Sequence, residues 1–128
     1  MACILLIDDN RNLRNLLRVQ LEGAGHRVLE AANGDEALRV YQENGADLVL
    51  CDLFMPGKEG LETIRELHER GESRIIAMSG DGPVGSSDLL RIAQVFGAAR
   101  ALSKPFDGQT LLDAVGEVLA APAKEGPS

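Results

Sequence analysis

Short apolar runs alternate along this chain with longer segments in which apolar residues recur every three or four positions. The runs predict five strands, at 3–7, 26–31, 47–51, 74–78 and 98–103. The third run is almost wholly apolar, which is typical of a strand buried on both faces of a sheet. The longer segments carry helical spacing, so the sequence predicts a helix after each strand.

Capping and stop signals favour the same helices. The predicted N-caps are Asn33, one residue of 86–88, and Asp107, and the third helix is predicted at Gly60–Arg70. Glycines such as Gly45 follow the helices where a stop is expected. In the first helix the leucines that recur at helical spacing are Leu13, Leu16, Leu17 and Leu21.

Five strands alternating with five helices predict one parallel sheet covered on both faces and joined by right-handed crossovers. The 128 residues suffice for about one domain. We expect this domain at 1–120, followed by a flexible polar tail at 121–128.

Polar side chains stand where four of these strands end. Asp8 and Asp9 follow the first strand, and Asp52 follows the third. Ser79 and Lys104 follow the fourth and fifth. Because parallel strands place their carboxyl ends at one edge, all of these groups are expected together, where open α/β sheets bind their ligands.

The residue types at this edge predict phosphoryl chemistry. Three carboxylates cannot share a site as anions without a cation, and oxygen ligands alone suit Mg²⁺ or Ca²⁺. Mg²⁺ with few carboxylates commonly marks a phosphoryl-handling site. With Lys104 and Ser79 beside it, Asp52 could accept a phosphoryl group as an acyl phosphate. Capping of the next helix is the alternative for Asp8 and Asp9, but it explains only one of them.

Composition narrows the choice of partners. The net charge of −7, and aromatic residues at only 3 % with no Trp, argue against direct nucleic-acid binding. Nothing resembles a signal peptide or a membrane span, so the expected location is the cytoplasm.

Cys3 and Cys51 are expected as apolar strand residues about 15 Å apart, too far for a disulfide. Arg11, Arg14 and Arg18 follow one helical stripe, which we interpret as a solvated face, with contact to an acidic partner as the alternative.

Taken in order, these residues resemble the receiver domain of bacterial two-component response regulators. The resemblance covers about Cys3 to Leu119. It is carried by the acidic, hydroxyl and lysine residues at the strand ends, together with Met55, Pro56, Gly60 and Pro105. It implies a flavodoxin-like, doubly wound sheet with strand order 2-1-3-4-5. It also implies a signalling protein rather than an enzyme, acting only in its own phosphorylation and dephosphorylation.

The resemblance further implies residue roles. Asp52 would be phosphorylated by a histidine kinase or a phosphotransfer protein. Asp9, Asp52 and the backbone carbonyl of Phe54 would bind Mg²⁺, with Asp8 acting through water. The phosphoryl-binding and switch positions would be Ser79, Gly80 and Lys104.

Other positions would modify this behaviour. The peptide before Pro105 is typically cis in the family. Phe54 and Asp81 would tune phosphoryl lifetime. Ala101 stands where the family usually has an aromatic residue, so we expect output through the glycine-rich segment 80–85 and residues 86–90 instead. No output domain follows, so docking or phosphorelay is expected.

Two alternatives remain at this point. One is a receiver-shaped interaction module that is never phosphorylated. The other is a haloacid-dehalogenase-type phosphatase, which would need an Asp-x-Asp motif that Asp8-Asp9-Asn10 does not supply.

Overall fold

A computed structural model of the protein describes residues 2–53, 60–79, 91, 93–104 and 106–120. The strands are β1 (Cys3–Ile7), β2 (Arg27–Ala31), β3 (Leu48–Asp52), β4 (Ile75–Ser79) and β5 (Arg100–Ser103). The labelled helices are α1 (Arg11–Gly23), α2 (Gly34–Asn44), α3 (Gly60–Glu69) and α5 (Gly108–Ala120). Residues 91 and 93–96, between β4 and β5, are also helical.

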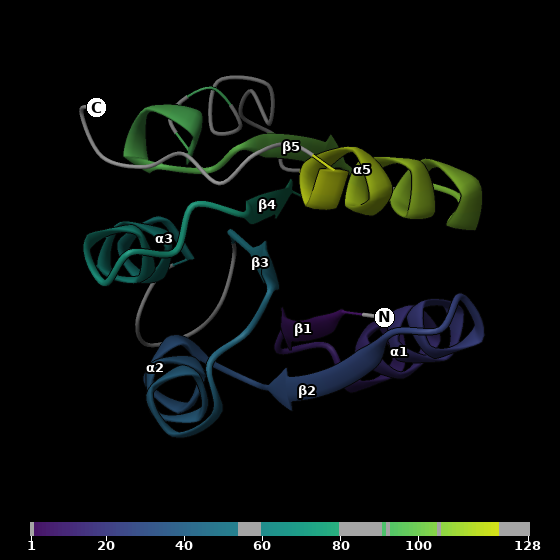
Figure 1. The fold of residues 1–128 in the computed structure, drawn as a ribbon, viewed down its shortest axis with the longest axis horizontal. Helices are drawn as coiled ribbons and strands as arrows, with labels where there is room; N and C mark the ends of the chain where they lie inside the picture. The colour runs from purple at the N-terminus through teal and green to yellow at the C-terminus, as the bar shows by residue number, and fades with distance from the viewer. Residues whose placement is uncertain (1, 54–59, 80–90, 92, 105, 121–128) are drawn as a thin grey trace.

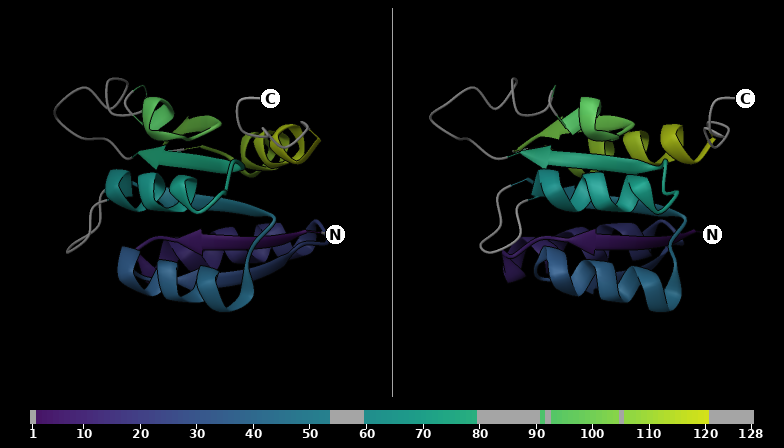
Figure 2. Two further views of the ribbon diagram at one scale, coloured as in Figure 1. Left: turned by 60° about the vertical axis from the view of Figure 1, so that its left-hand side comes forward. Right: turned by 90° about the vertical axis from the view of Figure 1, so that its left-hand side faces the viewer.

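The five strands form one parallel sheet in the order β2-β1-β3-β4-β5. Ile7 pairs with Ala31 on one side and Cys51 on the other, and Asp52 pairs with Met78. Figure 2 shows the strand arrows running in one direction, so their carboxyl ends share one edge. The predicted flavodoxin-like topology is therefore confirmed.

Helices cover both faces of the sheet. Figure 1 shows α1 and α5 on one face, with α2 and α3 on the other. Alternate strand residues supply the two cores because successive side chains point to opposite faces. Leu6 and Leu50 pack with Leu17 and Val115 on the α1–α5 side. On the other side the core contains, among others, Leu5, Ile7, Val49, Ala37, Ile64 and Leu67. β3 and β4 are buried throughout, as expected for central strands.

Some predicted details are wrong at the element ends. β2 begins at Arg27 rather than His26, and β5 begins at Arg100 rather than Ala98. β4 extends to Ser79, beyond the predicted end at residue 78. Ser79 remains within the ladder because it pairs with Ser103. Of the four leucines at helical spacing in α1, Leu16 is 54 % exposed. At about 100° per residue it lies at the edge of the face that carries the buried Leu17 and Leu21, on the side nearer to solvent.

Two of the predicted caps are confirmed. Asn33 accepts a hydrogen bond from the Glu36 N–H at 2.8 Å, and Asp107 accepts one from the Thr110 N–H at 2.7 Å. The second bond lowers the pKa of Asp107. Gly45 follows α2 with φ of 70°, a left-handed conformation that favours glycine. Within the part of the chain that the structure describes, no helix has the length and apolar composition of a membrane span.

Candidate phosphoryl and metal site

Asp8 is held in the candidate site by backbone and side-chain contacts. It follows β1 directly and is fully buried. Its N–H donates to the Ala31 carbonyl at 3.1 Å, which continues the pairing of β1 with β2. Its Oδ1 accepts from the Asn10 N–H at 2.9 Å, and its Oδ2 accepts from Lys104 Nζ at 3.0 Å. Both carboxylate oxygens therefore have partners within the site.

Asp52 and Asp9 complete the acidic cluster. Asp52 is the last residue of β3 and is only 4 % exposed, whereas Asp9 is exposed. One carboxylate oxygen from each of Asp8, Asp9 and Asp52 lies within 4.8 Å of the others. The structure thus brings together the three acids that the strand ends predicted.

Lys104 supplies the positive charge at this edge. Its Nζ lies 3.0 Å from Asp8 Oδ2 and 3.4 Å from Asp52 Oδ1. Its backbone N–H donates to the Ser79 carbonyl at 2.7 Å, which continues the pairing of β4 with β5. Ser79 is fully buried and lies one residue beyond Met78, the partner of Asp52. Ser79 and Lys104 therefore stand at the carboxyl ends of the next two strands, with the Lys104 ammonium in contact with Asp52.

The capping alternative for Asp8 and Asp9 is not what the structure shows. Asn10 is the N-cap of α1, and its side-chain oxygen accepts from the Leu13 N–H at 3.1 Å. The Asp8 side chain accepts from the backbone N–H of Asn10, which lies before the helix, and from Lys104 Nζ. Neither contact of Asp8 is a helix cap, and one carboxylate oxygen from each of Asp8, Asp9 and Asp52 lies within 4.8 Å of the others.

Gly60 permits α3 to begin against the end of β3. A Cβ at this position would lie 2.2 Å from the carbonyl oxygen of Asp52 and 2.5 Å from Leu53 Cα. The Gly60 N–H also donates to the Leu53 carbonyl at 3.3 Å. The first turn of α3 therefore packs directly on the backbone that carries Asp52.

Cys51 lies in the apolar layer next to this edge. It is fully buried, and its pKa is raised by burial first and then by the charges of Asp52 and Asp8. The thiol therefore stays protonated and behaves as the small apolar residue that was predicted. Cys3 and Cys51 are both free thiols.

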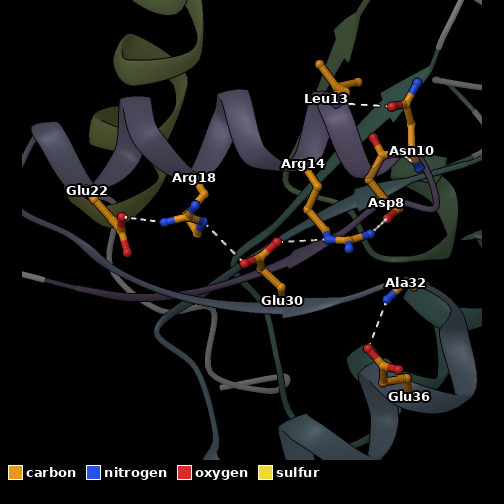
Figure 3. Close-up of polar contacts among 9 residues, drawn as sticks. All are labelled: Asp8, Asn10, Leu13, Arg14, Arg18, Glu22, Glu30, Ala32 and Glu36. Carbon is orange, nitrogen blue, oxygen red and sulfur yellow. Dashed lines mark hydrogen bonds and ion pairs between the residues drawn. The ribbon is translucent and has the colours of Figure 1, made fainter.

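Arg14 contacts the site although sequence analysis placed it on a solvated face. Its Nη1 donates to the Asp8 carbonyl at 2.8 Å, and its Nε donates to Glu30 Oε1 at the same distance (Figure 3). Arg18 is also paired, with Glu22 and Glu30. The interpretation of this stripe as a solvated face is therefore wrong for Arg14, whose side chain is 16 % exposed, whereas the Arg18 side chain is 34 % exposed. A clue in the sequence was Glu30, an acid within the predicted neighbouring strand.

Several predicted site positions lie outside the described residues. These are Phe54, Gly80, Asp81 and Pro105, together with the proposed output segments 80–85 and 86–90. Ala101 is described: it pairs with Ala77 in the sheet and packs at the edge of the core on the α2–α3 side.

The charges at this edge fit a hard divalent cation. Asp8, Asp9 and Asp52 approach one another with Lys104 as the ammonium group contacting Asp8 and Asp52. Close like charges are unfavourable, and oxygen donors are the ligands that Mg²⁺ prefers. Asp8, Asp9 and Asp52 are the described residues that would hold such an ion.

Comparisons with known proteins agree with this arrangement. Residues 4–116 match the family model of the response regulator receiver domain. The chain is 36 % identical over 118 residues to the chemotaxis protein CheY of Halobacterium salinarum, covering 92 % of this chain and 97 % of that protein. It is 33 % identical over 117 residues to sporulation initiation phosphotransferase F of Bacillus subtilis, covering 91 % and 92 %.

A solved structure gives the same fold. The response regulator receiver domain protein from Clostridium thermocellum matches with a TM-score of 0.85 and 31 % identity, over 93 % of this chain and 94 % of that one. The chain spans only 33 % and 48 % of the length of two transcriptional regulators that it also matches. Similarity to those larger proteins therefore concerns this one domain.

Proposed function

Because this chain belongs to the family of response regulator receiver domains, we propose that it is switched by phosphorylation of Asp52. One observation carries the proposal: the nearly buried Asp52 carboxylate lies 3.4 Å from Lys104, within an acidic cluster suited to a divalent cation. A carboxylate held in this way can act as the nucleophile toward a phosphoryl group.

The proposed reaction transfers a phosphoryl group from a phosphohistidine to Asp52. A carboxylate oxygen of Asp52 forms the new bond to phosphorus as the bond from phosphorus to the donor imidazole breaks. The displaced imidazole nitrogen takes up a proton. Lys104 then moves its ammonium toward the phosphoryl oxygens, while the Ser79 hydroxyl donates a hydrogen bond to another. The support is the 3.4 Å distance from Lys104 Nζ to Asp52 Oδ1, together with the place of Ser79 one residue beyond Met78, the strand partner of Asp52.

We propose that Mg²⁺ is bound directly by Asp9, Asp52 and the Phe54 carbonyl, with Asp8 acting through water. The support is the approach of the three carboxylates to within 4.8 Å. When bound, the ion would neutralise the negative charge that carboxylates and phosphoryl oxygens place together. Lys104 already offsets part of that charge through Asp8 and Asp52.

The proposed partners are a histidine kinase or phosphotransfer protein and a downstream docking protein. Receiver domains act by such contacts in the cytoplasm, and we place this protein there as well. We assign the domain to 1–120 and a tail to 121–128.

Output through 80–90 remains our proposal, and it is motivated by Ala101, whose small side chain cannot replace the ring found in most relatives. Phe54 and Asp81 remain the proposed lifetime-tuning positions.

Phosphorylation can be tested by intact-mass measurement. The protein is incubated with acetyl phosphate and Mg²⁺, and Asp52→Asn is treated in parallel. We expect a gain of one phosphoryl group in the parent and none in the variant. Equal labelling of both proteins would refute Asp52, and no labelling of the parent would favour the unphosphorylated interaction module. Sustained turnover of the donor would instead favour the phosphatase alternative.

A further inference from the structure

Arg14 links helix α1 to the backbone of the acidic site. Its guanidinium donates from Nη1 to the Asp8 carbonyl and from Nε to Glu30, both at 2.8 Å (Figure 3). The Arg14 side chain is 16 % exposed, so most of it is shielded from water. A planar guanidinium with two fixed contacts has little freedom to rotate.

The contacts of Arg14 are held by a chain of charges along α1 and β2. Glu30 accepts from Arg14 at one oxygen, and its other oxygen lies 3.3 Å from Arg18 Nε. Arg18 in turn pairs with Glu22 at 3.0 Å, one helical turn further along. Figure 3 shows the series running beneath α1 from Glu22 to Asp8. Glu30 therefore fixes the orientation of the guanidinium that reaches the site.

The contact to the Asp8 carbonyl has a specific consequence for Asp9. The Asp8 carbonyl belongs to the peptide that joins Asp8 to Asp9, and a peptide unit is planar. Fixing that oxygen fixes the plane, and hence the position from which the Asp9 side chain leaves the backbone. Asp9 is exposed, so its direction toward Asp8 and Asp52 depends largely on its own backbone.

We propose that Arg14 is a positioning residue for the metal site, acting through the Asp8–Asp9 peptide. This inference rests on the proposed function, because it concerns binding of Mg²⁺ to the same carboxylates. The opposite effect must be weighed: a nearby cation repels Mg²⁺, so loss of Arg14 charge alone would tighten binding. Glu30 pairs with Arg14 and offsets that repulsion. We therefore expect the loss of positioning to dominate.

The test is a Mg²⁺ titration of the full chain, followed through the backbone amide NMR signals of Asp9 and Asn10. Arg14→Gln should weaken Mg²⁺ binding about tenfold, at the lower end of effects known for residues that support metal ligands. Arg14→Lys should weaken it similarly. A lysine keeps the charge but cannot contact both Glu30 and the Asp8 carbonyl in the same fork geometry.

Arg18→Gln is the matched control. It removes two ion pairs from the same helix and from Glu30 but no contact to Asp8. It should change the Mg²⁺ affinity by about twofold or less, because ion pairs this exposed contribute little. Melting temperatures without Mg²⁺ measure the loss of general stability in each variant, and Arg14→Gln should remain folded at the temperature of the titration, so that its weaker binding reports metal positioning.

Three outcomes would overturn the inference. Unchanged Mg²⁺ affinity in both Arg14 variants would leave Arg14 as a simple tether between α1 and β2. Tighter binding in Arg14→Gln with parental affinity in Arg14→Lys would assign the effect to charge instead. In both cases the parent still binds Mg²⁺, so the proposed function stands. A parent that binds no Mg²⁺ would overturn the inference and its metal-site premise together.

Discussion

The two ends of the sheet each bury carboxylate groups, but they do so in opposite ways. At the carboxyl edge Asp8, Asp9 and Asp52 crowd together beside Lys104. At the amino edge the acid Glu72 is buried, with 7 % exposure. Its two oxygens accept from Tyr41 Oη at 3.1 Å and from the Arg74 N–H at 3.0 Å.

The difference separates a closed polar network from a site built for a ligand. Burial raises the pKa of Glu72, and the hydrogen bonds from Arg74 and Tyr41 oppose that shift. Burial, then the adjacent carboxylate, raises the pKa of Tyr41 to about 12, so the phenol remains a donor at neutral pH. At the carboxyl edge three carboxylates lie beside one ammonium group, and a divalent cation can offset the excess negative charge. The buried acid at the amino edge thus belongs to a network of hydrogen bonds, and those at the carboxyl edge form the proposed metal site.

The largest effect is expected from truncating the amino-edge acid. Glu72→Ala removes the carboxylate that accepts hydrogen bonds from the Tyr41 hydroxyl and from the Arg74 backbone N–H. We expect a loss of about 2–3 kcal/mol in the free energy of unfolding, measured by urea denaturation. Phosphorylation of Asp52 should persist under native conditions. A loss below about 0.5 kcal/mol would show that this network contributes nothing beyond ordinary surface contacts.

Glu72→Gln serves as the control for charge. Because the pKa of Glu72 is raised from 4.5 in the folded protein, the native state binds more protons than the unfolded state. The parent therefore becomes less stable as the pH rises from about 4.5 through the pKa of Glu72 in the folded protein. Glu72→Gln has no group that titrates at this position, so it does not lose stability in this way. Over that pH range, the free energy of unfolding of Glu72→Gln should rise relative to that of the parent.

The next effect concerns the backbone beneath Asp52. Gly60→Ala places a methyl group 2.2 Å from the Asp52 carbonyl oxygen, so α3 or the end of β3 must move. We expect a loss of about 2 kcal/mol by urea denaturation, with slower phosphorylation. Gly116→Ala is the control, because a Cβ there meets nothing within 4 Å in the interior of α5. It should instead stabilise the protein by about 0.5–1 kcal/mol. Equal effects in the two variants would contradict the close approach at Gly60.

The smallest effect should have the opposite sign from that of Glu72→Ala. Asp52→Asn removes one charge from the acidic cluster, while Lys104 keeps its contact with Asp8. Without Mg²⁺ we expect the variant to be more stable than the parent by about 1 kcal/mol. Millimolar Mg²⁺ should reduce that difference, since the parent gains stability by binding the ion. A variant less stable than the parent in EDTA would mean that Asp52 supports the fold rather than the site.

The meeting of polar residues at the strand ends was predictable because it follows from the parallel direction of the strands alone. Parallel strands end at a common edge, so Asp8, Asp52, Ser79 and Lys104 could be brought together without knowing any side-chain contact. The rule needs only the existence and direction of each strand. Errors of one or two residues in a strand boundary, such as those in β2 and β5, do not alter it.

The contacts that were missed depend on rotation and register instead. Arg14 reaches Glu30 only because α1 lies over β2 with that face turned inward, and Leu16 is exposed for the same reason. The pair of Tyr41 and Glu72 joins residues 31 positions apart through the packing of α2 near the start of β4. Such pairs follow from tertiary packing, which spacing along the chain does not determine.

The most direct test of the account is to locate the phosphoryl group in the parent protein. The chain is treated with acetyl phosphate with or without Mg²⁺, trapped with borohydride, digested, and mapped by mass spectrometry. We predict modification of the peptide containing Asp52 only, and only with Mg²⁺, while the peptide containing Glu72 remains unmodified. Modification at Glu72 or another carboxylate, or labelling of Asp52 that is indifferent to Mg²⁺, would contradict the assignment of the carboxyl edge as a metal-dependent phosphoacceptor site.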